Sequence, residues 1–234
     1  MLFLHEVHKV KGAEEEAFEA AWRDAWTTRL AEGDEARVLW YLNQAHGAGP
    51  SYTVITITAV RDGAAWEALA RRIQHGDLAA LVADQDRLRH EVTAKLLLPV
   101  PWSPMQEVDL DDVPVEGASH ELSLYMEDTG WPSAPLGDYV EFWGRTYFPG
   151  IMDRPPDQRL LDIQASFQVA HGAGRRPEAI LMQKVVNHEG LLALLSHETA
   201  AQYRRPGAFM HDALAYRDQW ESRLLRTSAW SPLY

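Results

Sequence analysis

The pentapeptide Ala-His-Gly-Ala-Gly occurs twice in this chain, at residues 45–49 and at residues 170–174. A second short match follows each copy, because Trp102-Ser103-Pro104 returns as Trp230-Ser231-Pro232. The two separations, 125 and 128 residues, nearly agree. These are therefore corresponding points in two copies of one structural unit, and the chain is limited to architectures built from two similar halves.

Hydrophobic periodicity predicts the same order of elements in both copies. The first copy has predicted strands at 2–10, 36–45, 52–60 and 93–100, with helical segments at 13–31 and 64–91. The second has predicted strands at 122–128, 161–170, 179–186 and 224–229, with helical segments at 138–151 and 189–223. The order β-α-β-β-α-β is the ferredoxin-like pattern. We therefore expect one ferredoxin-like unit at 1–104, an acidic linker at 105–118 and a second unit at 119–234.

Two such units predict a specific α+β architecture. A four-stranded sheet covered by helices on one side leaves its other face bare, which is unstable in water. Two sheets packed face to face cover each other, so we expect an intramolecular pseudo-dimeric α/β barrel.

The composition of the chain limits which partners it can bind and which cellular compartment we expect. The net charge is −12, with 22 basic residues against 34 acidic ones, which disfavours nucleic acid and anionic membranes as partners. The absence of cysteine excludes disulfides and thiol nucleophiles. We expect a cytoplasmic protein that acts on a small molecule, with a homodimer of the tandem chain as one further assembly.

The chain resembles the dimeric α/β-barrel superfamily, and within it the NIPSNAP-like branch. The resemblance rests on the opening strand Leu4-His5-Glu6-Val7, on Lys9-Val10-Lys11-Gly12 before the first helix, and on a glycine turn followed by the apolar strand 54–57. This superfamily includes cofactor-free monooxygenases, EthD-like proteins, polyketide and terpenoid tailoring enzymes, and haem enzymes such as chlorite dismutases and dye-decolorising peroxidases. The resemblance thus implies a barrel that binds a small molecule without deciding its chemistry.

Alternation along the strands suggests which side chains line the barrel, because successive residues point to opposite faces. One face is apolar in both copies and should lie under the helices, which leaves a mixed face for the lumen. The residues expected in the lumen are Glu6, Tyr41, Asn43, Thr56, Thr58, Tyr125, Glu127, Gln164, Ser166, Gln168 and Gln183. Buried polar groups are costly unless they are hydrogen-bonded, so this set predicts a bound ligand or, alternatively, a satisfied polar seam.

Glu6 and Glu127 are the candidate bases, with His8 as an auxiliary. A carboxylate desolvated inside a barrel has a raised pKa, which suits proton abstraction near neutral pH. The alternative is that both carboxylates are structural.

Aromatic side chains on the first helix of the second copy, Trp143 and Tyr147, are candidates to hold a flat ligand, or else core residues. The second copy is the richer in aromatic residues around this helix, so we expect the site there. His46 and His171 in the repeated turns are candidate gate residues, although a turn that suits His-Gly for backbone reasons explains them better.

The function expected on these grounds is cofactor-independent proton abstraction from an aromatic or polyketide-like metabolite, followed by oxygenation, cyclisation or elimination, as in monooxygenase- or cyclase-like tailoring enzymes of natural product biosynthesis. One alternative is a haem enzyme with His197 as the axial ligand. Another is a non-catalytic binding or interaction protein.

Overall fold

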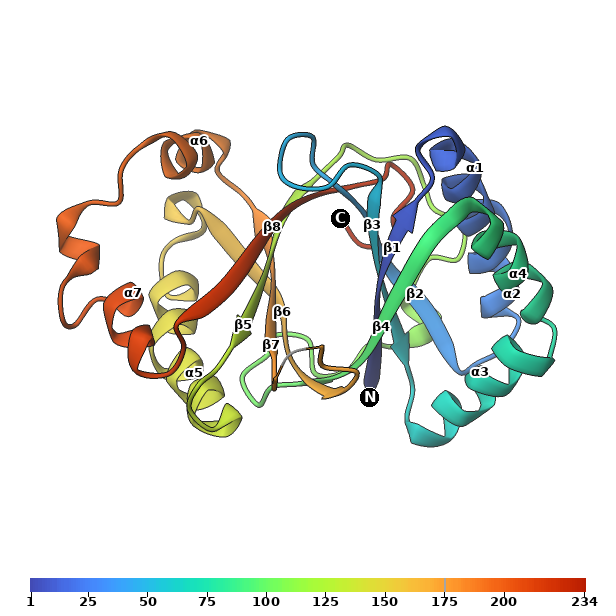
Figure 1. The fold of residues 1–234 in the computed structure, drawn as a ribbon, viewed down its shortest axis with the longest axis horizontal. Coiled ribbons are helices and arrows are strands. Elements are labelled where there is room, and N and C mark those ends of the chain that lie inside the picture. The colour runs from blue at the N-terminus through green and yellow to red at the C-terminus, as the bar shows by residue number, and fades with distance from the viewer. Residues whose placement is uncertain (175) are drawn as a thin grey trace.

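Eight antiparallel strands close into one barrel in the computed structural model, which describes residues 1–174 and 176–234 (Figure 1). The strands of the first half are β1 (Leu2–Val10), β2 (Ala36–Gln44), β3 (Thr53–Val60) and β4 (Arg89–Pro99). Those of the second half are β5 (Leu124–Trp131), β6 (Leu161–His171), β7 (Ala179–Val185) and β8 (Gln219–Thr227). The order around the barrel is β1-β3-β2-β8-β5-β7-β6-β4. Each half thus forms a ferredoxin-like sheet, and the halves join at the β2–β8 and β6–β4 pairs.

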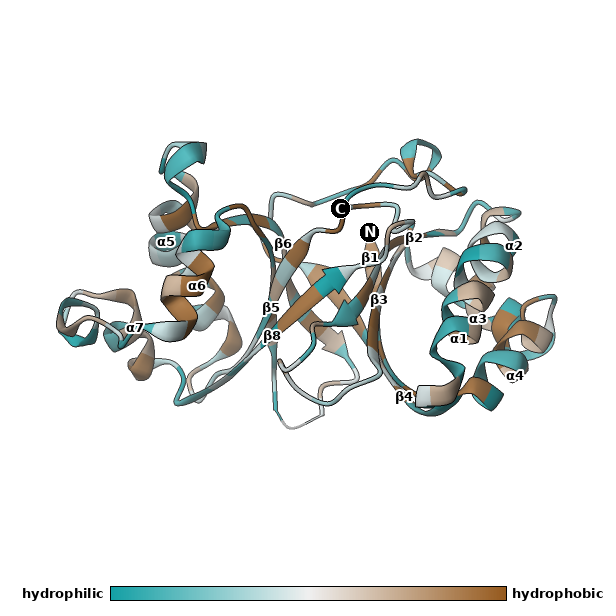
Figure 2. Ribbon diagram, turned by 90° about the horizontal axis from the view of Figure 1, so that it is seen from above, coloured by the Kyte–Doolittle hydropathy of each residue, from teal (hydrophilic) through white to brown (hydrophobic). Residues whose placement is uncertain are grey.

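The helices of the two halves lie on opposite flanks of the barrel (Figures 1 and 2). The first half carries α1 (Glu15–Ala20), a π-helical turn at Ala21–Trp26, α2 (Thr27–Ala31), α3 (Gly63–His75) and α4 (Ala79–Leu88). The second half carries α5 (Leu136–Met152), α6 (His188–Ser196) and α7 (Phe209–Asp212). Short 3₁₀ turns lie at Gly12–Glu14, Leu110–Asp112, Pro156–Gln158, Ala201–Arg204 and Ala213–Ala215. Among the described residues, no helix combines the length and apolarity needed to span a bilayer.

The last helical region is where the sequence prediction fails most. Residues 189–223 were expected to be helical, but α6 ends at Ser196, and β8 begins at Gln219 instead of residue 224. Between them only short helical pieces form, on either side of Gly207, whose φ of 88° no regular helix adopts. The β8 residues that follow pair with β5 from Gln219 onward, so sheet pairing overrides the local helical pattern.

The barrel interior is a packed apolar core that draws on both halves. Its largest side chains include Phe3, Trp40, Tyr125 and Phe167, and the rings of Phe3 and Phe167 lie 4.8 Å apart between centroids. An eight-stranded barrel is just wide enough for side chains to fill it. The acidic segment 105–118 contributes as well, because the buried Leu110 and Val113 pack into the same cluster.

The strand registers of the two halves correspond closely. Each second strand contains a bulge, at Leu39 in β2 and at Gln164 in β6. Glu6 pairs with Thr56, whereas Asp128 pairs with Leu181, which lies 125 residues after Thr56. Glu6 and Asp128 are therefore equivalent positions, and the first strands align at an offset of 122.

Candidate functional site

The barrel interior is not the polar chamber that strand alternation predicted. Apolar rows face inward, and the mixed rows face the helices. The predicted site residues that lie on the helix side are Glu6, His8, Tyr41, Asn43, Thr56, Thr58, Ser166, Gln168 and Gln183. Tyr125 and Glu127 do face the interior. Gln164 is the bulge residue of β6, and its amide donates to the Asp162 carboxylate.

Two features of the backbone explain this reversal. The interior of a small barrel must be filled by side chains, so the bulky apolar rows occupy it and the polar rows are left to the helix side. The bulges at Leu39 and Gln164 also change the phase of alternation within their strands. In addition, the offset of 121 assumed for the first strands equated Glu6 with Glu127, whereas the register equates Glu127 with His5.

Glu127 is the centre of a buried ionic cluster inside the barrel. Its Oε2 accepts a 2.7 Å hydrogen bond from His5 Nε2, and its Oε1 lies 3.4 Å from Nη1 of Arg223. Burial raises the pKa of Glu127, but His5, Arg223 and Lys95 outweigh that effect and lower its pKa to about 2. A carboxylate held this firmly in its ionised form is a weak proton acceptor, so the predicted role of Glu127 as a base lacks physical support.

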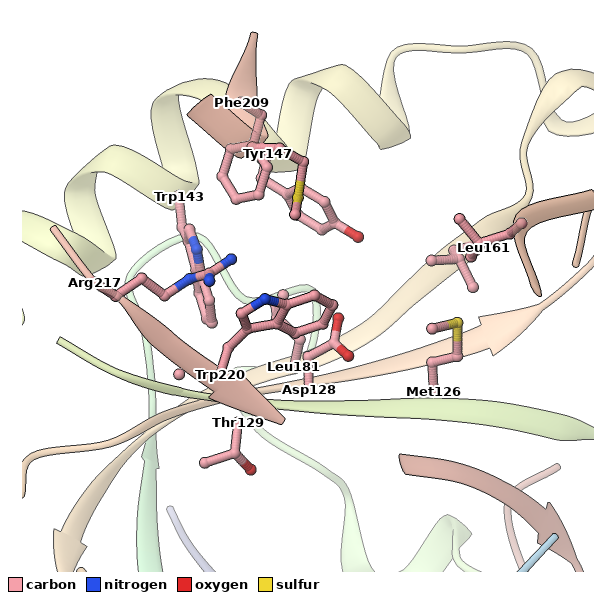
Figure 3. Close-up of a pocket in the computed structure, with 13 residues that line it drawn as sticks. Met126, Asp128, Thr129, Trp143, Tyr147, Leu161, Leu181, Phe209, Arg217 and Trp220 are labelled. Atoms are coloured by element: carbon pink, nitrogen blue, oxygen red, sulfur yellow. The ribbon is translucent and has the colours of Figure 1, made fainter. Parts of the chain in front are cut away.

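A cavity of about 150 Å³ lies instead on the helix side of the second sheet (Figure 3). Helix α5 contributes Trp143 and Tyr147, and α7 contributes Phe209. The remaining lining comes from the sheet, from α6 and α7, and from the segment between α7 and β8: Met126, Asp128, Thr129, Gly130, Leu161, Leu181, Leu194, Met210, Arg217 and Trp220. An apolar aromatic pocket with few convergent polar groups is the usual form of a small-molecule site.

A chain of hydrogen bonds leads from α5 to a carboxylate in the cavity wall. The Tyr147 hydroxyl donates to Gln183 Oε1 at 2.7 Å, and Gln183 Nε2 donates to Asp128 Oδ2 at 2.9 Å. The other carboxylate oxygen of Asp128, Oδ1, is buried without a well-formed hydrogen bond to any described residue. Asp128 therefore has one oxygen fixed by Gln183 and one without a well-formed hydrogen bond to a described residue.

The electrostatics of Asp128 suit a general base. Burial raises its pKa to about 6, while Ser222, Gln183 and Arg217 moderate the rise. A base with a pKa slightly below neutrality is largely ionised at pH 7 and still accepts a proton effectively. This carboxylate can thus remove a proton from a bound molecule.

The equivalent space in the first half is filled. His8 stands where the second half has Gly130, since each pairs with the corresponding residue of its third strand, Val54 or Ala179. The His8 ring lies 5.3 Å from the ring of Phe18 and 5.4 Å from that of Trp22. At Gly130, by contrast, any Cβ atom would collide with the hydroxyl of Tyr139. The Tyr139 side chain thus takes the place of the His8 ring in the second half, and the cavity lies beside it.

Glu6, the counterpart of Asp128, belongs to this packed half. Burial raises its pKa, against lowering by Arg89, His5 and Thr56. Its Oε2 accepts a long, 3.5 Å hydrogen bond from the Thr56 hydroxyl. His8 is held on both sides, with Nε2 3.2 Å from Thr56 Oγ1 and Nδ1 2.7 Å from Nη1 of Arg89. His8 is therefore enclosed by protein, Glu6 is half-buried, and neither residue lines the cavity.

The repeated histidines are exposed, His46 in a turn and His171 at the end of β6. The glycine after each has a positive φ, 79° at Gly47 and 89° at Gly172. A left-handed backbone favours glycine at these positions. The turn geometry therefore accounts for the repeated motif, and neither histidine lines the cavity.

Sequence reasoning missed Asp128, Gly130 and Arg217. Arg217 is 5% exposed and follows α7 and its 3₁₀ turn. It corresponds to Arg89 at the offset of 128 that the Trp-Ser-Pro match already indicated. With an offset of 122 residues for the first strands, Glu6 aligns with Asp128. With an offset of 128 residues for the last strands, Arg89 aligns with Arg217. The sequence repeats indicate only the offset of 128.

The fold is shared with solved structures at low sequence identity. A protein assigned as a monooxygenase from Lactobacillus acidophilus matches with a TM-score of 0.60 and 9% identity, over 99% of this chain and 96% of its own. An anthrone oxidase-like protein matches with a TM-score of 0.60 and 9% identity, over 97% and 91%. A NIPSNAP domain protein from Burkholderia xenovorans matches 44% of this chain and 99% of its own, at 16% identity and a TM-score of 0.39.

These likenesses show that the chain has the dimeric α/β-barrel fold, as its resemblance to that superfamily predicted. No protein-family model matches the chain, and no curated protein matches its sequence.

Haem, the alternative cofactor, requires a larger cavity and an axial ligand. A cavity of about 150 Å³ accommodates a single aromatic ring, and a tetrapyrrole is far larger. No histidine is among its lining residues, and His197, the predicted axial ligand, is an exposed residue at the end of α6. The described residues also contain no group of three side chains suited to a metal ion. The cavity as formed does not fit haem.

Proposed function

We propose that the chain is an enzyme that removes a proton from a small molecule with one aromatic ring, bound in the cavity of the second half. Asp128 is the base, and Tyr147 and Gln183 are the residues that position it. The observation that carries this proposal is that Asp128 lines an aromatic cavity while its buried Oδ1 has no well-formed hydrogen bond to a described residue. In the first half the aromatic rings of Phe18 and Trp22 pack against His8, two residues after the equivalent carboxylate, Glu6.

The step requires a carbon acid. A C–H bond next to a carbonyl group breaks, its proton passes to Oδ1 of Asp128, and its electron pair moves onto the carbonyl oxygen. The positive charge of Arg217, which also lines the cavity, stabilises the resulting enolate. Protonation, cyclisation or elimination can follow from the enolate. In the monooxygenase-like form, dioxygen converts a CH₂ group to C=O, with one oxygen atom entering the product and the other leaving as water.

Deuterium exchange tests proton abstraction independently of the later outcome. Phenylacetone and phenylpyruvate carry one ring and an exchangeable CH₂ group, and NMR in D₂O follows the loss of those protons. We expect the protein to accelerate exchange, and Asp128→Asn to reduce the rate by about 10²- to 10⁴-fold, the usual contribution of a general base. An oxygen electrode then shows whether dioxygen is consumed.

The matched comparison is Glu6→Gln, which alters the equivalent carboxylate of the packed half. If this substitution, and not Asp128→Asn, abolishes exchange, the reacting site lies in the first half and the proposal is wrong. A non-catalytic binding protein gives a third pattern, in which ring compounds raise the melting temperature but exchange stays at the buffer rate.

A further inference from the structure

Arg217 is a buried cation that forms no ion pair with any carboxylate of the described residues. Its side chain is 5% exposed and its Nε has no hydrogen-bond partner among the described residues. Figure 3 shows the guanidinium beside the rings of Trp143 and Trp220, where it borders the cavity. A buried charge is costly unless it is paired.

The equivalent arginine of the first half is fully paired. Arg89 donates through Nε and Nη2 to Oδ1 of Asp86, at 2.9 and 2.5 Å. Its third nitrogen, Nη1, lies 2.7 Å from Nδ1 of His8. Both partners come from the chain itself, so this half needs nothing from outside to hold the cation.

Both partners are replaced in the second half. Asp86 precedes Arg89 by three residues, and the residue three before Arg217 is Leu214, which is 62% exposed. The position of His8 is occupied by Gly130, which borders the cavity. The Tyr139 hydroxyl, which lies against Gly130 and interacts with Arg217, stands in the place of the imidazole. The arginine has thus been kept while the carboxylate that satisfied its counterpart is absent.

The protein offers Arg217 only partial compensation. Its Cζ lies 5.1 Å from the centroid of the Trp220 ring, a cation–π contact. The charges of Arg217 and Asp128 also interact, but their side chains form no ion pair. Neither contact supplies the bidentate anion that a guanidinium fork favours.

We propose that the cavity takes an organic anion with one aromatic ring, whose carboxylate pairs with Arg217 in the place that Asp86 occupies beside Arg89. The ring lies between Trp143, Tyr147 and Phe209, and the anionic group points towards Gly130, near the end of β5. This deepens the proposed function by naming the class of its substrate, and it rests on that function only for the location of the site. Phenylpyruvate, with its carboxylate and CH₂ group, represents the class, and phenylacetone is its neutral counterpart.

A matched pair of ligands tests the charge requirement. Fluorine NMR titration compares 4-fluorobenzoate with 4-fluorobenzamide, which has nearly the same shape without the charge. We expect the anion to bind more tightly by on the order of 10-fold or more, the usual effect of a charge-assisted hydrogen bond. Equal binding of the two, or binding of neither at millimolar concentration, overturns the proposal.

Two substitutions test the residue. Arg217→Gln should abolish the preference for the anion, and circular dichroism checks that the variant folds. Leu214→Asp acts from outside the cavity by returning the internal carboxylate, and should weaken anion binding by about 10-fold while leaving binding of the amide unchanged. If both variants bind the anion as the unmodified chain does, Arg217 does not recognise it.

Asp128→Asn separates this inference from the proposed reaction. This variant should lose deuterium exchange yet bind 4-fluorobenzoate at least as tightly as the unmodified chain, since a neighbouring negative charge is removed. Anion binding that requires Arg217, together with no exchange in the unmodified chain, would refute the reaction and leave the anion site standing. Exchange that proceeds equally with phenylacetone and phenylpyruvate would refute the anion site and leave the reaction standing.

Discussion

His5 and Glu127, which occupy equivalent positions in the two halves, meet inside the barrel. Their side chains are joined by a 2.7 Å hydrogen bond, and both residues are 1% exposed. Strands β1 and β5 stand opposite each other in the closed barrel, so this contact crosses the interior and links the halves through their first strands. The two halves differ at this equivalent position, which holds an imidazole in the first half and a carboxylate in the second, so the two side chains can form a hydrogen bond.

Removing the charge of Glu127 should destabilise the fold. Glu127→Gln leaves Arg223 and His5 without their buried anion, and loss of one partner of such a pair costs about 3 kcal/mol of unfolding free energy. Urea denaturation measures the change. The control is Glu141→Gln, which alters an exposed pair with Arg145 and should change stability by less than about 0.5 kcal/mol. Equal stability of both variants would show that the interior pair is inert.

Lowering the pH should affect the stability of the protein in opposite directions through two carboxylates, Glu127 and Asp128. The pKa of Glu127 falls from 4.5 to about 2 on folding. Its contribution, about 3 kcal/mol, is therefore present above pH 4.5 and lost as pH falls towards 2. The pKa of Asp128 rises from 3.8 to about 6. Stability should therefore increase by about 3 kcal/mol as pH falls from 6 to 4.

Asp128→Asn isolates the second of these effects. Urea midpoints measured from pH 3 to pH 8 should show a maximum between pH 4 and 5 for the unmodified chain. In Asp128→Asn the gain between pH 6 and 4 should vanish, while the loss below pH 4.5 remains. A variant that keeps the gain would place the raised pKa on another group.

Catalysis by Asp128 should follow its ionisation. The rate of deuterium exchange per molecule of enzyme should rise about tenfold per pH unit below pH 6 and level off above it, because only the ionised carboxylate accepts the proton. The profile is measured as kcat/KM against pH with phenylpyruvate. A rate that falls as pH rises through 6 would mean that the protonated form is active, which excludes the role of base.

The cavity should close when Gly130 acquires a side chain. Gly130→Ala places a methyl group against the Tyr139 hydroxyl, so we expect overpacking to cost about 1–3 kcal/mol and ligand binding to be lost. Gly137→Ala is the control, because its Cβ would meet no atom within 4 Å; that helix position should gain up to about 1 kcal/mol. Undiminished binding by Gly130→Ala in the fluorine titration would place the ligand elsewhere.

The site was only partly visible before the structure. Trp143 and Tyr147 were singled out as a platform for a flat ligand, and the structure places both in the cavity wall. Gln183 was expected in the lumen but holds Asp128 on the other face of its strand. The sequence pattern does not identify Asp128, because an offset of 121 for the first strands aligns the neighbouring Glu127 with Glu6.

The sequence by itself determined the architecture of this protein. The repeated turn, the order of apolar segments and the bare face of each sheet led to two ferredoxin-like units closed into one barrel, since few folds bury two such sheets. Only the tertiary structure decided which face of each strand lines the barrel. Bulges and register shifts of one residue invert the facing of a strand, and no local pattern records them. The tertiary structure alone also shows that Asp128 and Arg217 border a cavity, whereas Arg89 is paired with Asp86 and His8.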